Sequence, residues 1–399
     1  MKAFSLFREK EKEFLDYISN HLLEVVCIAL TLVALLIRVF PRDFVGMDAK
    51  YSLLPWFDTI KKGGGFKALS TQVGDYSIFY QELIAFFTYI PVKPIYIYKV
   101  IAAIFDVAQA VMVAGLVKYF TKDKFKTVLS YAVALLLPTV LLDSAVWAQC
   151  DNMYTFLALA AIYCILKKKN ILAFVLLGIA FSIKLQPVLL IPFFLYVWYK
   201  KKEYSILHFF LIPITMEVLT IPAVIAGRGI FDCFTELFKQ TNNWKNLYNN
   251  YPSFWALVFP ESNSAHYDMF KMFCILFCVA MLIIVIVFIE KYVKITDVSL
   301  LYIAFILTYT TVLFLPSMHE RYGYSYELLA LVILFINWRT IFNFVSLICI
   351  AVVSYVPFLL NNKVFAMHSI AVINLITYGL YIYVLVKYSD KLIIKKEDK

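Results

Sequence analysis

Long runs of apolar residues, separated by short polar and often basic segments, dominate the chain. A membrane-spanning helix needs ~20 mostly apolar residues. About twelve segments approach this pattern, near residues 20–40, 96–119, 127–143, 152–167, 170–185, 187–200, 204–222, 269–290, 298–316, 322–338, 340–360 and 364–387. The shorter runs have to pack inside a bundle or thin the bilayer locally. The pattern predicts an all-α fold, a polytopic membrane helix bundle of about 12 transmembrane helices.

The stretch at residues 76–91 is also apolar, but it is short and contains Glu82. Cytoplasmic segments of membrane proteins carry an excess of Lys and Arg. If residues 76–91 form an interfacial helix and not a span, the basic clusters all fall on one side of the membrane, namely 2–12, 118–126, 167–169, 200–202, 291–294 and 387–399. We therefore place both termini of this multi-pass protein in the cytoplasm and the 76–91 helix along the outer surface.

This topology produces two long loops on the outer side, at residues 41–95 and 223–268. Loops of this length are usually functional, and we expect interfacial helices in the first one. The second loop is rich in Asn, Trp and Tyr. These residues are typical of a segment that lies at the membrane interface, and they also suit stacking against sugar rings. Residues 1–387 then form a single transmembrane domain, followed by a basic cytoplasmic tail at 388–399. The run at 20–40 lacks a small-x-small cleavage site, so we expect it to be the first membrane helix.

The composition agrees with lipid as the main solvent of the chain. Hydrophobic residues make up 62% of it and charged residues 16%, against roughly 45–50% and 25% in soluble proteins. The formal net charge is +10, but the Lys and Arg residues stand in short clusters between apolar runs. Such clusters are typical of segments that face anionic lipid. We therefore exclude nucleic acid as a partner and expect membrane lipids instead.

Ionisable residues near a membrane are costly and are candidates for function. Four such groups fall at outer helix ends in this topology. Asp48 follows the first apolar run, with Asp75 in the same loop; Asp151 lies in a very short loop; Lys184 ends the fifth run; and residues 319–321, His-Glu-Arg, fill a turn. Each group has a structural alternative: an ordinary loop carboxylate, a helix N-cap for Asp151, a snorkelling Lys184 and an ion pair within residues 319–321.

The combination of these groups suits a transfer from a phosphate. A carboxylate can act as general base on an acceptor hydroxyl, and cations can stabilise a departing phosphate. We therefore predict Asp48 and Asp151 as catalytic residues. We predict Lys184 and Arg321 as the binding site of the donor phosphate.

At these positions the sequence resembles the bacterial membrane glycosyltransferases related to the Gpi18-like mannosyltransferases, members of the GT-C fold superfamily. The resemblance covers most of the chain and rests on the following motifs: Asp48 with Leu54-Pro55-Trp56 and Gly63-Gly64-Gly65-Phe66, Gly74-Asp75-Tyr76, Trp147-Ala148-Gln149-Cys150-Asp151, Lys184-Leu185-Gln186-Pro187 and Met318-His319-Glu320-Arg321-Tyr322. Family members typically show Trp-Gly-Gln where this chain has residues 147–149. The order of the motifs and their common side of the membrane make the set specific.

The resemblance implies transfer from a polyprenyl-phosphate-sugar donor, with inversion at the anomeric carbon. It also implies that an Asp of the first outward loop is the general base, which corresponds to Asp48. We expect a hexose to be moved to a cell-envelope glycan or lipid-linked acceptor on the outer face of the cell membrane. Candidate substrate-binding residues are Asp75, Tyr76, Gln149, Gln186, His319 and Glu320.

Some GT-C enzymes use a divalent metal ion. Potential metal ligands in this chain are Asp48, Asp151, His319 and Glu320. Because Lys184 and Arg321 can neutralise a phosphate without a metal ion, we expect no metal and no other cofactor.

Two alternative functions involve the same lipid-linked sugars. A flippase or transporter predicts paired broken helices and an internal repeat, neither of which the sequence shows. A polysaccharide polymerase would use Arg residues in two large outer loops, whereas the second loop has only Arg228. Asp106 and Glu217 lie inside apolar runs, where they either line a cavity or bond between helices.

Overall fold

The computed structural model describes residues 2–240, 245–259, 266–359 and 366–388. Its regular secondary structure is helical throughout these ranges. The α-helices are α1 (Lys2–Asn20), α2 (Leu22–Val39), α3 (Leu54–Lys62), α4 (Ile78–Phe87), α5 (Pro94–Thr121), α6 (Lys124–Leu136), α7 (Pro138–Leu141), α8 (Asp151–Leu166), α9 (Asn170–Ile183), α10 (Ile191–Lys201), α11 (Leu211–Leu219), α12 (Ile221–Ile225), α13 (Asp232–Gln240), α14 (Trp255–Val258), α15 (Tyr267–Tyr292), α16 (Asp297–Phe314), α17 (Tyr324–Ile336), α18 (Ile341–Leu359) and α19 (Met367–Tyr388). Short π or 3-10 segments are η1 (Ala49–Leu53), η2 (Gly65–Ser70), η3 (Leu142–Val146), η4 (Gln186–Leu190), η5 (Ile206–Phe210) and η6 (Trp338–Thr340).

Within the described ranges, six helices are long and apolar enough to cross a membrane: α2, α5, α15, α16, α18 together with η6, and α19. The bent pair of α6 with α7 and η3 raises the number to seven if it counts as one span. Shorter apolar helices are α4, α8, α9, α17 and α11 with η5. Each apolar run predicted from the sequence contains a helix, and the expected all-α polytopic membrane bundle is confirmed. The short α8 and α17 are almost entirely buried, so they pack inside the bundle.

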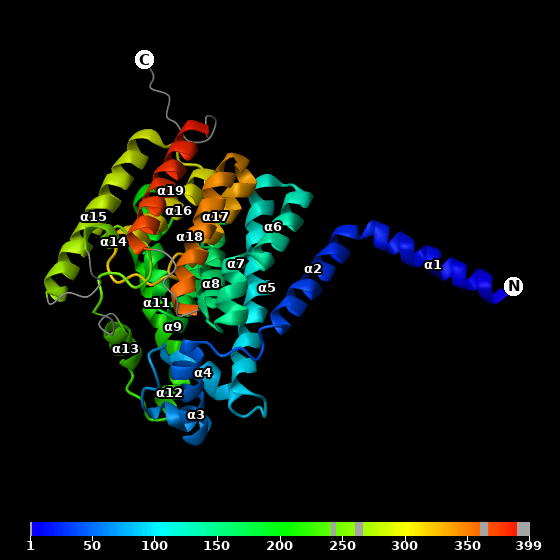
Figure 1. Cartoon of the computed structure of the whole chain (residues 1–399), viewed down its shortest axis with the longest axis horizontal. Helices are drawn as coiled ribbons and strands as arrows, with labels where there is room; N and C mark the ends of the chain where they lie inside the picture. Colours follow the sequence, from blue (N-terminus) through cyan, green and yellow to red (C-terminus); the bar gives the residue numbers. More distant parts are fainter. Residues whose placement is uncertain (1, 241–244, 260–265, 360–365, 389–399) are drawn as a thin grey trace, which may run out of the picture.

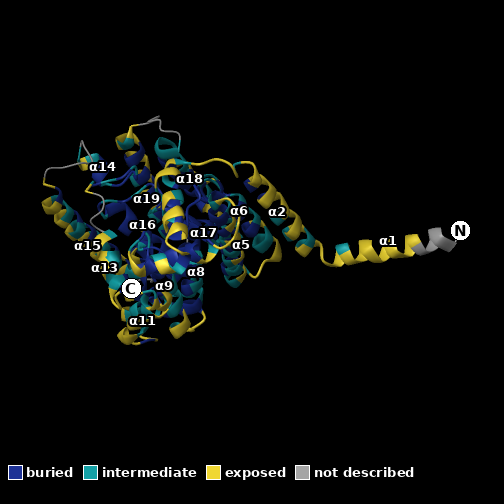
Figure 2. Cartoon of the chain, turned by 90° about the horizontal axis from the view of Figure 1, so that it is seen from below, coloured by how far each residue is buried: buried dark blue, intermediate teal, exposed yellow. Residues whose placement is uncertain are grey.

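The helices α15 to α19 pack against one another in sequence order, beside α5, α6 and α8 (Figure 1). The amphipathic α1 extends away from this bundle (Figure 1). Figure 2 shows that exposed residues follow α1 and the outer faces of the peripheral helices, whereas buried residues fill the interior. Exposed positions on α2 and α15 are predominantly large and apolar, as expected for faces that contact lipid.

The first outward loop predicted from the sequence contains α3 and α4, which gather with α12 at one end of the bundle (Figure 1). The helix predicted at residues 76–91 is α4, with 10 residues. A helix of that length rises ~15 Å, half of the ~30 Å hydrocarbon core. It packs against α3, α9 and α12. Its length and packing therefore favour an interfacial helix over a span.

The apolar run predicted at residues 127–143 is broken at Pro138, where the axis bends by 43°. Proline cannot donate the hydrogen bond that would continue α6. The chain then passes through η3 and reaches Ala148, whose φ is 60°. A left-handed backbone costs a residue other than glycine roughly 1–2 kcal/mol, which explains a preference for glycine at this position. The turn nevertheless stays tight, because the Gln149 amide donates to the Asp143 carbonyl at 3.0 Å.

A buried ion pair joins the peripheral α2 to the bundle. Arg38 Nε donates to Asp106 Oδ2 at 2.9 Å. Asn152 Nδ2 donates to Asp106 Oδ1 at 2.8 Å, and Ser144 Oγ donates to Oδ2 at 2.5 Å. Asp106 therefore bonds between helices, which was one of its two expected roles. Because Asn152 directly follows Asp151, this network also anchors the first turn of α8.

Candidate active site

Four polar segments that are far apart in the sequence meet at the end of the bundle that α3 and α4 cover. Asp48 precedes η1, Asp151 begins α8, Lys184 directly follows α9, and Arg321 lies in the turn before α17. Apolar residues of α3, α4, α8 and α9 form one buried cluster around this end. The helices therefore fix the backbone from which each polar side chain extends.

Asp48 accepts hydrogen bonds on a single oxygen. Trp147 Nε1 and Gln149 Nε2 each donate to Asp48 Oδ2 at 2.9 Å, and Arg321 Nη2 lies 3.5 Å from the same atom. Within the described residues, no hydrogen bond reaches Oδ1. The Asp48 side chain is 27% exposed. One oxygen of this carboxylate is thus held in place, while the other is free to accept a bond from a bound molecule.

Asp151 is completely buried between two cations. Lys184 Nζ donates to Asp151 Oδ1 at 3.0 Å, and Arg321 Nη1 donates to Asp151 Oδ2 at 2.6 Å. The relative exposures of the three side chains are 0% for Asp151, 7% for Lys184 and 9% for Arg321. Charges this deeply buried persist only when they are paired. The alternative of a helix N-cap is wrong, because Cys150 occupies that position and the Asp151 side chain makes no capping bond.

Gln149 links Asp48 to Arg321. Its Oε1 accepts from Tyr76 Oη at 2.6 Å and from Arg321 Nη1 at 2.7 Å, while its Nε2 donates to Asp48. The Lys184 ammonium also lies 5.2 Å from the centre of the Tyr76 ring, and the Arg321 guanidinium lies 4.7 Å from the centre of the Trp147 ring. Both distances suit cation–π contacts. The orientation of Arg321 is therefore set by carboxylates, an amide and an aromatic face.

Glu320 and His319 complete the cluster on the side of the turn before α17. Arg321 Nε donates to Glu320 Oε1 at 3.4 Å, and His319 Nδ1 lies 4.0 Å from Glu320 Oε2. Burial, with the nearby charges of Arg321 and Lys184, lowers the pKa of His319 to about 3. The imidazole is therefore neutral at physiological pH. Burial also raises the pKa of Glu320 above its ordinary value.

The structure brings together most, but not all, of the residues proposed from the sequence. Asp48, Tyr76, Gln149, Asp151, Lys184, Glu320 and Arg321 form one connected network, with His319 at its edge. Gln186 is buried in η4 and interacts with Tyr322. Asp75 is exposed and makes no hydrogen bond or ion pair with a described residue. It lies beside Tyr76 but outside the network.

Two further residues of this site were not proposed from the sequence. Trp147 is fully buried and donates to Asp48, although it was noted only as part of a motif. Asp143 is fully buried in η3 and interacts with Asp151. The signal for Asp143 was an acidic residue at the end of an apolar run, where a charge requires an explanation.

The arrangement of the acidic side chains bears on metal binding. No group of three His, Cys, Asp or Glu residues is placed to hold a metal ion in the part of the chain that the structure describes. Both oxygens of Asp151 and one oxygen of Asp48 are already paired with cations or N–H donors. This donor set does not fit a divalent ion, which requires several converging oxygen or nitrogen ligands.

Comparison with known families supplies an independent observation. The model of glycosyltransferase family 87 matches residues 76–316, which is more than half of the chain. This range contains Tyr76, Gln149, Asp151 and Lys184, whereas Asp48 and Arg321 lie outside it. No curated protein sequence matches the chain.

Proposed function

The chain belongs to glycosyltransferase family 87, and from this membership we propose that it moves a hexose from a polyprenyl-phosphate-sugar donor to a hydroxyl of a cell-envelope glycan or lipid-linked acceptor. Membership establishes glycosyl transfer in general, and the apolar helices indicate a membrane enzyme. The donor class, the acceptor, the outer-face location, inversion and a relation to the Gpi18-like GT-C enzymes are the parts that we add.

The Asp48 carboxylate is the observation that carries this proposal. Its Oδ2 accepts from Trp147, Gln149 and Arg321, so Oδ1 remains for the hydroxyl of an acceptor. A partly exposed Asp48 is accessible to that hydroxyl, whereas the completely buried Asp151 is not. These features support Asp48 as the general base.

The proposed reaction is a single displacement. Asp48 Oδ1 takes the proton of the acceptor hydroxyl while the hydroxyl oxygen attacks the anomeric carbon from the face opposite to the phosphate. A new carbon–oxygen bond forms, the bond from the anomeric carbon to the phosphate oxygen breaks, and its electron pair leaves with the polyprenyl phosphate. The products are an inverted glycoside, polyprenyl phosphate and a protonated Asp48.

Lys184 and Arg321 are our candidates for stabilising the charge that develops on the departing phosphate. An ammonium carries three N–H donors, and Lys184 gives one of them to Asp151. A guanidinium carries five; Arg321 uses its Nε hydrogen, both Nη1 hydrogens and one Nη2 hydrogen within the site, so one Nη2 hydrogen remains for a phosphate. Asp151 then acts as a positioning residue that keeps the two cations at a fixed separation. With the cations supplying this charge, we propose that the transfer needs no metal ion.

The remaining polar groups suit the binding of sugar hydroxyls. The neutral imidazole of His319, the Gln149 amide and the Tyr76 hydroxyl all form hydrogen bonds without adding charge. Asp75 and Gln186 flank this group, and Glu320 lies beside Arg321. A polyprenyl donor also fits this location. When its phosphate is bound at the ends of the helices, its prenyl chain extends into the bilayer along their lipid-facing side chains.

A transfer assay with purified protein in detergent tests the proposal. The protein is incubated with synthetic polyprenyl-phosphate hexoses and cell-envelope glycan acceptors, and release of polyprenyl phosphate is measured with and without EDTA. We expect release that requires an acceptor, is unchanged by EDTA and falls at least ~100-fold in Asp48→Asn, the scale of general-base catalysis. Asp58→Asn, an exposed carboxylate of the same loop, is the matched control and should retain activity.

Three outcomes would contradict separate parts of the proposal. Full activity of Asp48→Asn would remove Asp48 as the base. Loss of release in EDTA that is restored by a divalent ion would overturn metal independence. Transfer from a nucleotide sugar, with none from any polyprenyl donor, would keep the family assignment and reject the donor class.

A further inference from the structure

One side of the segment from η5 to α12 is apolar and exposed along its whole length. Large apolar side chains stand three or four residues apart on this side, as neighbours on one helix face do. Each of them is between 49% and 82% exposed: Leu207, Phe210, Ile214, Val218, Ile221 and Ile225. On the opposite side, α11 packs so closely against α9 that a Cβ atom at Gly178 would lie 2.5 Å from the Cβ of Thr215. The apolar side therefore faces away from the bundle, toward lipid.

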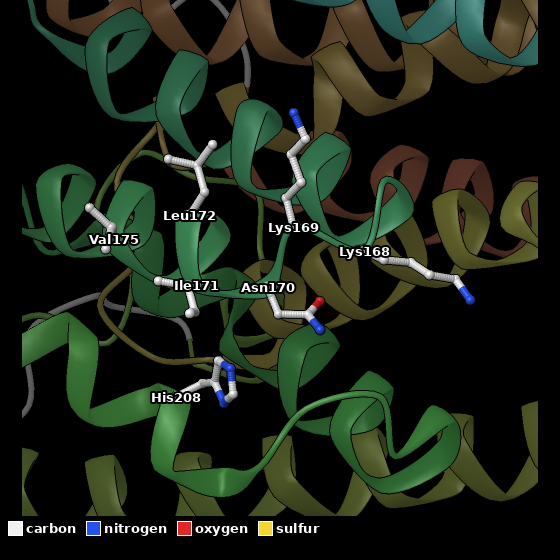
Figure 3. A pocket seen from close by; sticks show the side chains of 7 residues that line it. All are labelled: Lys168, Lys169, Asn170, Ile171, Leu172, Val175 and His208. Atoms are coloured by element: carbon white, nitrogen blue, oxygen red, sulfur yellow. The ribbon is translucent and has the colours of Figure 1, made fainter.

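The length of this apolar side matches one bilayer. It begins beside a polar turn, where Lys168 and Lys169 line a cavity of about 560 Å³ together with His208 of η5 (Figure 3). Residues 206–225 contain η5, α11 and α12. About 20 helical residues rise ~30 Å, which is the thickness of the hydrocarbon core. Ile225 therefore lies at the opposite boundary of the core, at the end of the bundle where Figure 1 shows α3 and α4.

The exposed apolar surface continues beyond Ile225 into α13. Ile230, Phe231 and Phe238 are 59%, 69% and 73% exposed. Phe231 and Phe238 are two helical turns apart, so they share one face of the helix. The neighbouring Lys239 has an exposed side chain. Aromatic side chains on one face with lysine beside them are typical of helices that lie in the membrane interface.

The other face of α13 is attached to the protein. Cys233 is buried, and its thiol donates to Glu217 Oε2 of α11 at 3.2 Å. Arg228 Nε lies 3.4 Å from Asp232 Oδ2, and its Nη2 lies 3.9 Å from Glu236 Oε1. These contacts prevent α13 from turning its aromatic face inward. An exposed apolar patch of this kind marks a surface that contacts a partner outside the chain.

We propose that this partner is the bilayer itself, and that α13 lies along the membrane surface at the end of the candidate active site. Ile225, Ile230, Phe231 and Phe238 insert among the lipids of that leaflet. Continuity favours lipid over a second copy of the chain, because the same surface begins as the lipid-facing side of α11. Insertion depends on apolar area and not on a particular headgroup. The surface does not depend on the proposed glycosyl transfer, and its location can be measured without any activity assay.

Spin-label accessibility of the full chain in phosphatidylcholine nanodiscs tests this surface. Phe231→Cys and Phe238→Cys each carry a label, in a background of Cys27→Ala and Cys349→Ser that removes the native thiols that are not buried. The measured quantity is the ratio of collisions with oxygen, which concentrates in lipid, to collisions with a water-soluble nickel complex. We expect a high ratio at both labels.

Two reference positions define the scale of this ratio. Leu276→Cys, exposed on the apolar helix α15, gives the lipid value, and Lys62→Cys, exposed at the end of α3, gives the water value. The labels at Phe231 and Phe238 should match Leu276→Cys. Ratios equal to that of Lys62→Cys would place α13 in water and overturn the proposal. Few collisions with either reagent, with dipolar coupling between labels on two chains, would show that a second copy covers the face and would also overturn it.

A charged substitution tests whether the aromatic face itself is inserted. Phe231→Asp should lower the ratio at the Phe238→Cys label towards the water value, because a charge is costly at the edge of the hydrocarbon core. Lys67→Asp, at an exposed position of η2, is the matched control and should leave that ratio unchanged. An unchanged ratio in Phe231→Asp would contradict insertion of this face. All variants should keep the wild-type unfolding temperature, because these side chains are exposed and not packed in the core.

Discussion

Asp151 is the residue on which the arrangement of the two cations depends. In Asp151→Asn the shape is kept, but Lys184 loses the carboxylate that it pairs with. Arg321 loses its shortest ion pair and keeps the longer ones to Asp48 and Glu320. An uncompensated buried charge typically costs ~3–5 kcal/mol. We expect a lower unfolding temperature in detergent and loss of glycosyl transfer. Asp75→Asn removes an exposed carboxylate from the same end of the molecule and should leave the unfolding temperature unchanged.

A double variant separates stability from chemistry at this site. Adding Lys184→Met to Asp151→Asn removes the cation that Asp151→Asn leaves without a carboxylate partner, so part of the lost stability should return. Transfer should stay low, because the leaving phosphate has also lost a cation. Recovery of the wild-type rate in the double variant would show that Lys184 does not stabilise the phosphate.

His319 should give the protein a characteristic acid sensitivity. Its pKa is lowered to about 3 in the folded protein, against about 6.5 in an unfolded chain. Between these values the unfolded chain binds a proton that the folded protein does not bind. Stability therefore falls as the pH drops from about 6.5 towards 3, by up to ~1.4 kcal/mol per unit. His319→Gln should make the decline of the unfolding temperature shallower in this window, whereas His368→Gln, at an exposed position, should not. Equal slopes for His319→Gln and the wild type would contradict the assignment.

At the scale of elements, Arg228 connects the two long loops. Its guanidinium donates to the Gln72 Oε1 and, at 3.4 Å, to the Leu69 carbonyl. It also pairs with Asp232 at 3.4 Å. Gln72 Nε2 in turn donates to the carbonyls of Gly74 and Tyr76 at 2.8 and 3.0 Å. The second loop therefore holds the segment that presents Tyr76 to Gln149.

Arg228→Gln should loosen this connection without touching the reacting groups. Misplacing a catalytic group by about 1 Å can cost ~100-fold in rate, so we expect transfer to fall between ~10- and 100-fold. Kinetic constants and the unfolding temperature measured together check this expectation. Arg42→Gln, an exposed arginine of the first loop, should retain wild-type kinetics. If the unfolding temperature of Arg228→Gln drops strongly while the folded fraction keeps wild-type kinetic constants, Arg228 has a purely structural role.

The positions of the helices could be predicted because the length of an apolar run reports directly on burial in lipid. The internal breaks were harder to predict. The run predicted at 127–143 was treated as unbroken, although proline ends a helix and the structure breaks at Pro138. The π turn η3 that follows depends on where Trp147 and Asp143 find partners. The pairing of Arg38 with Asp106 joins residues that are 68 positions apart. Hydropathy contains no information about such a pair.

At the scale of the whole molecule, the prediction of the site depended on topology. Asp48, Asp151, Lys184 and Arg321 were expected on one side of the membrane, and the structure places them in one network. Which cation pairs with which carboxylate could not be predicted, because that depends on distances between helix ends. Asp75 was grouped with them by its motif, yet its side chain remains outside the network. A motif indicates position along the chain but not the direction of a side chain.

The same topology predicts which end of the molecule faces the cytoplasm. Lysine clusters are expected inside, so Lys202, directly after α10, should be cytoplasmic. Lys62, the last residue of α3, belongs to the first outward loop and should be external. In a Cys349→Ser background, which removes the exposed native thiol, an impermeant maleimide should label Lys62→Cys in intact cells. Lys202→Cys should react only after permeabilisation. The reverse pattern would place Asp48 in the cytoplasm, and a sugar donor displayed on the outer face would then be out of reach.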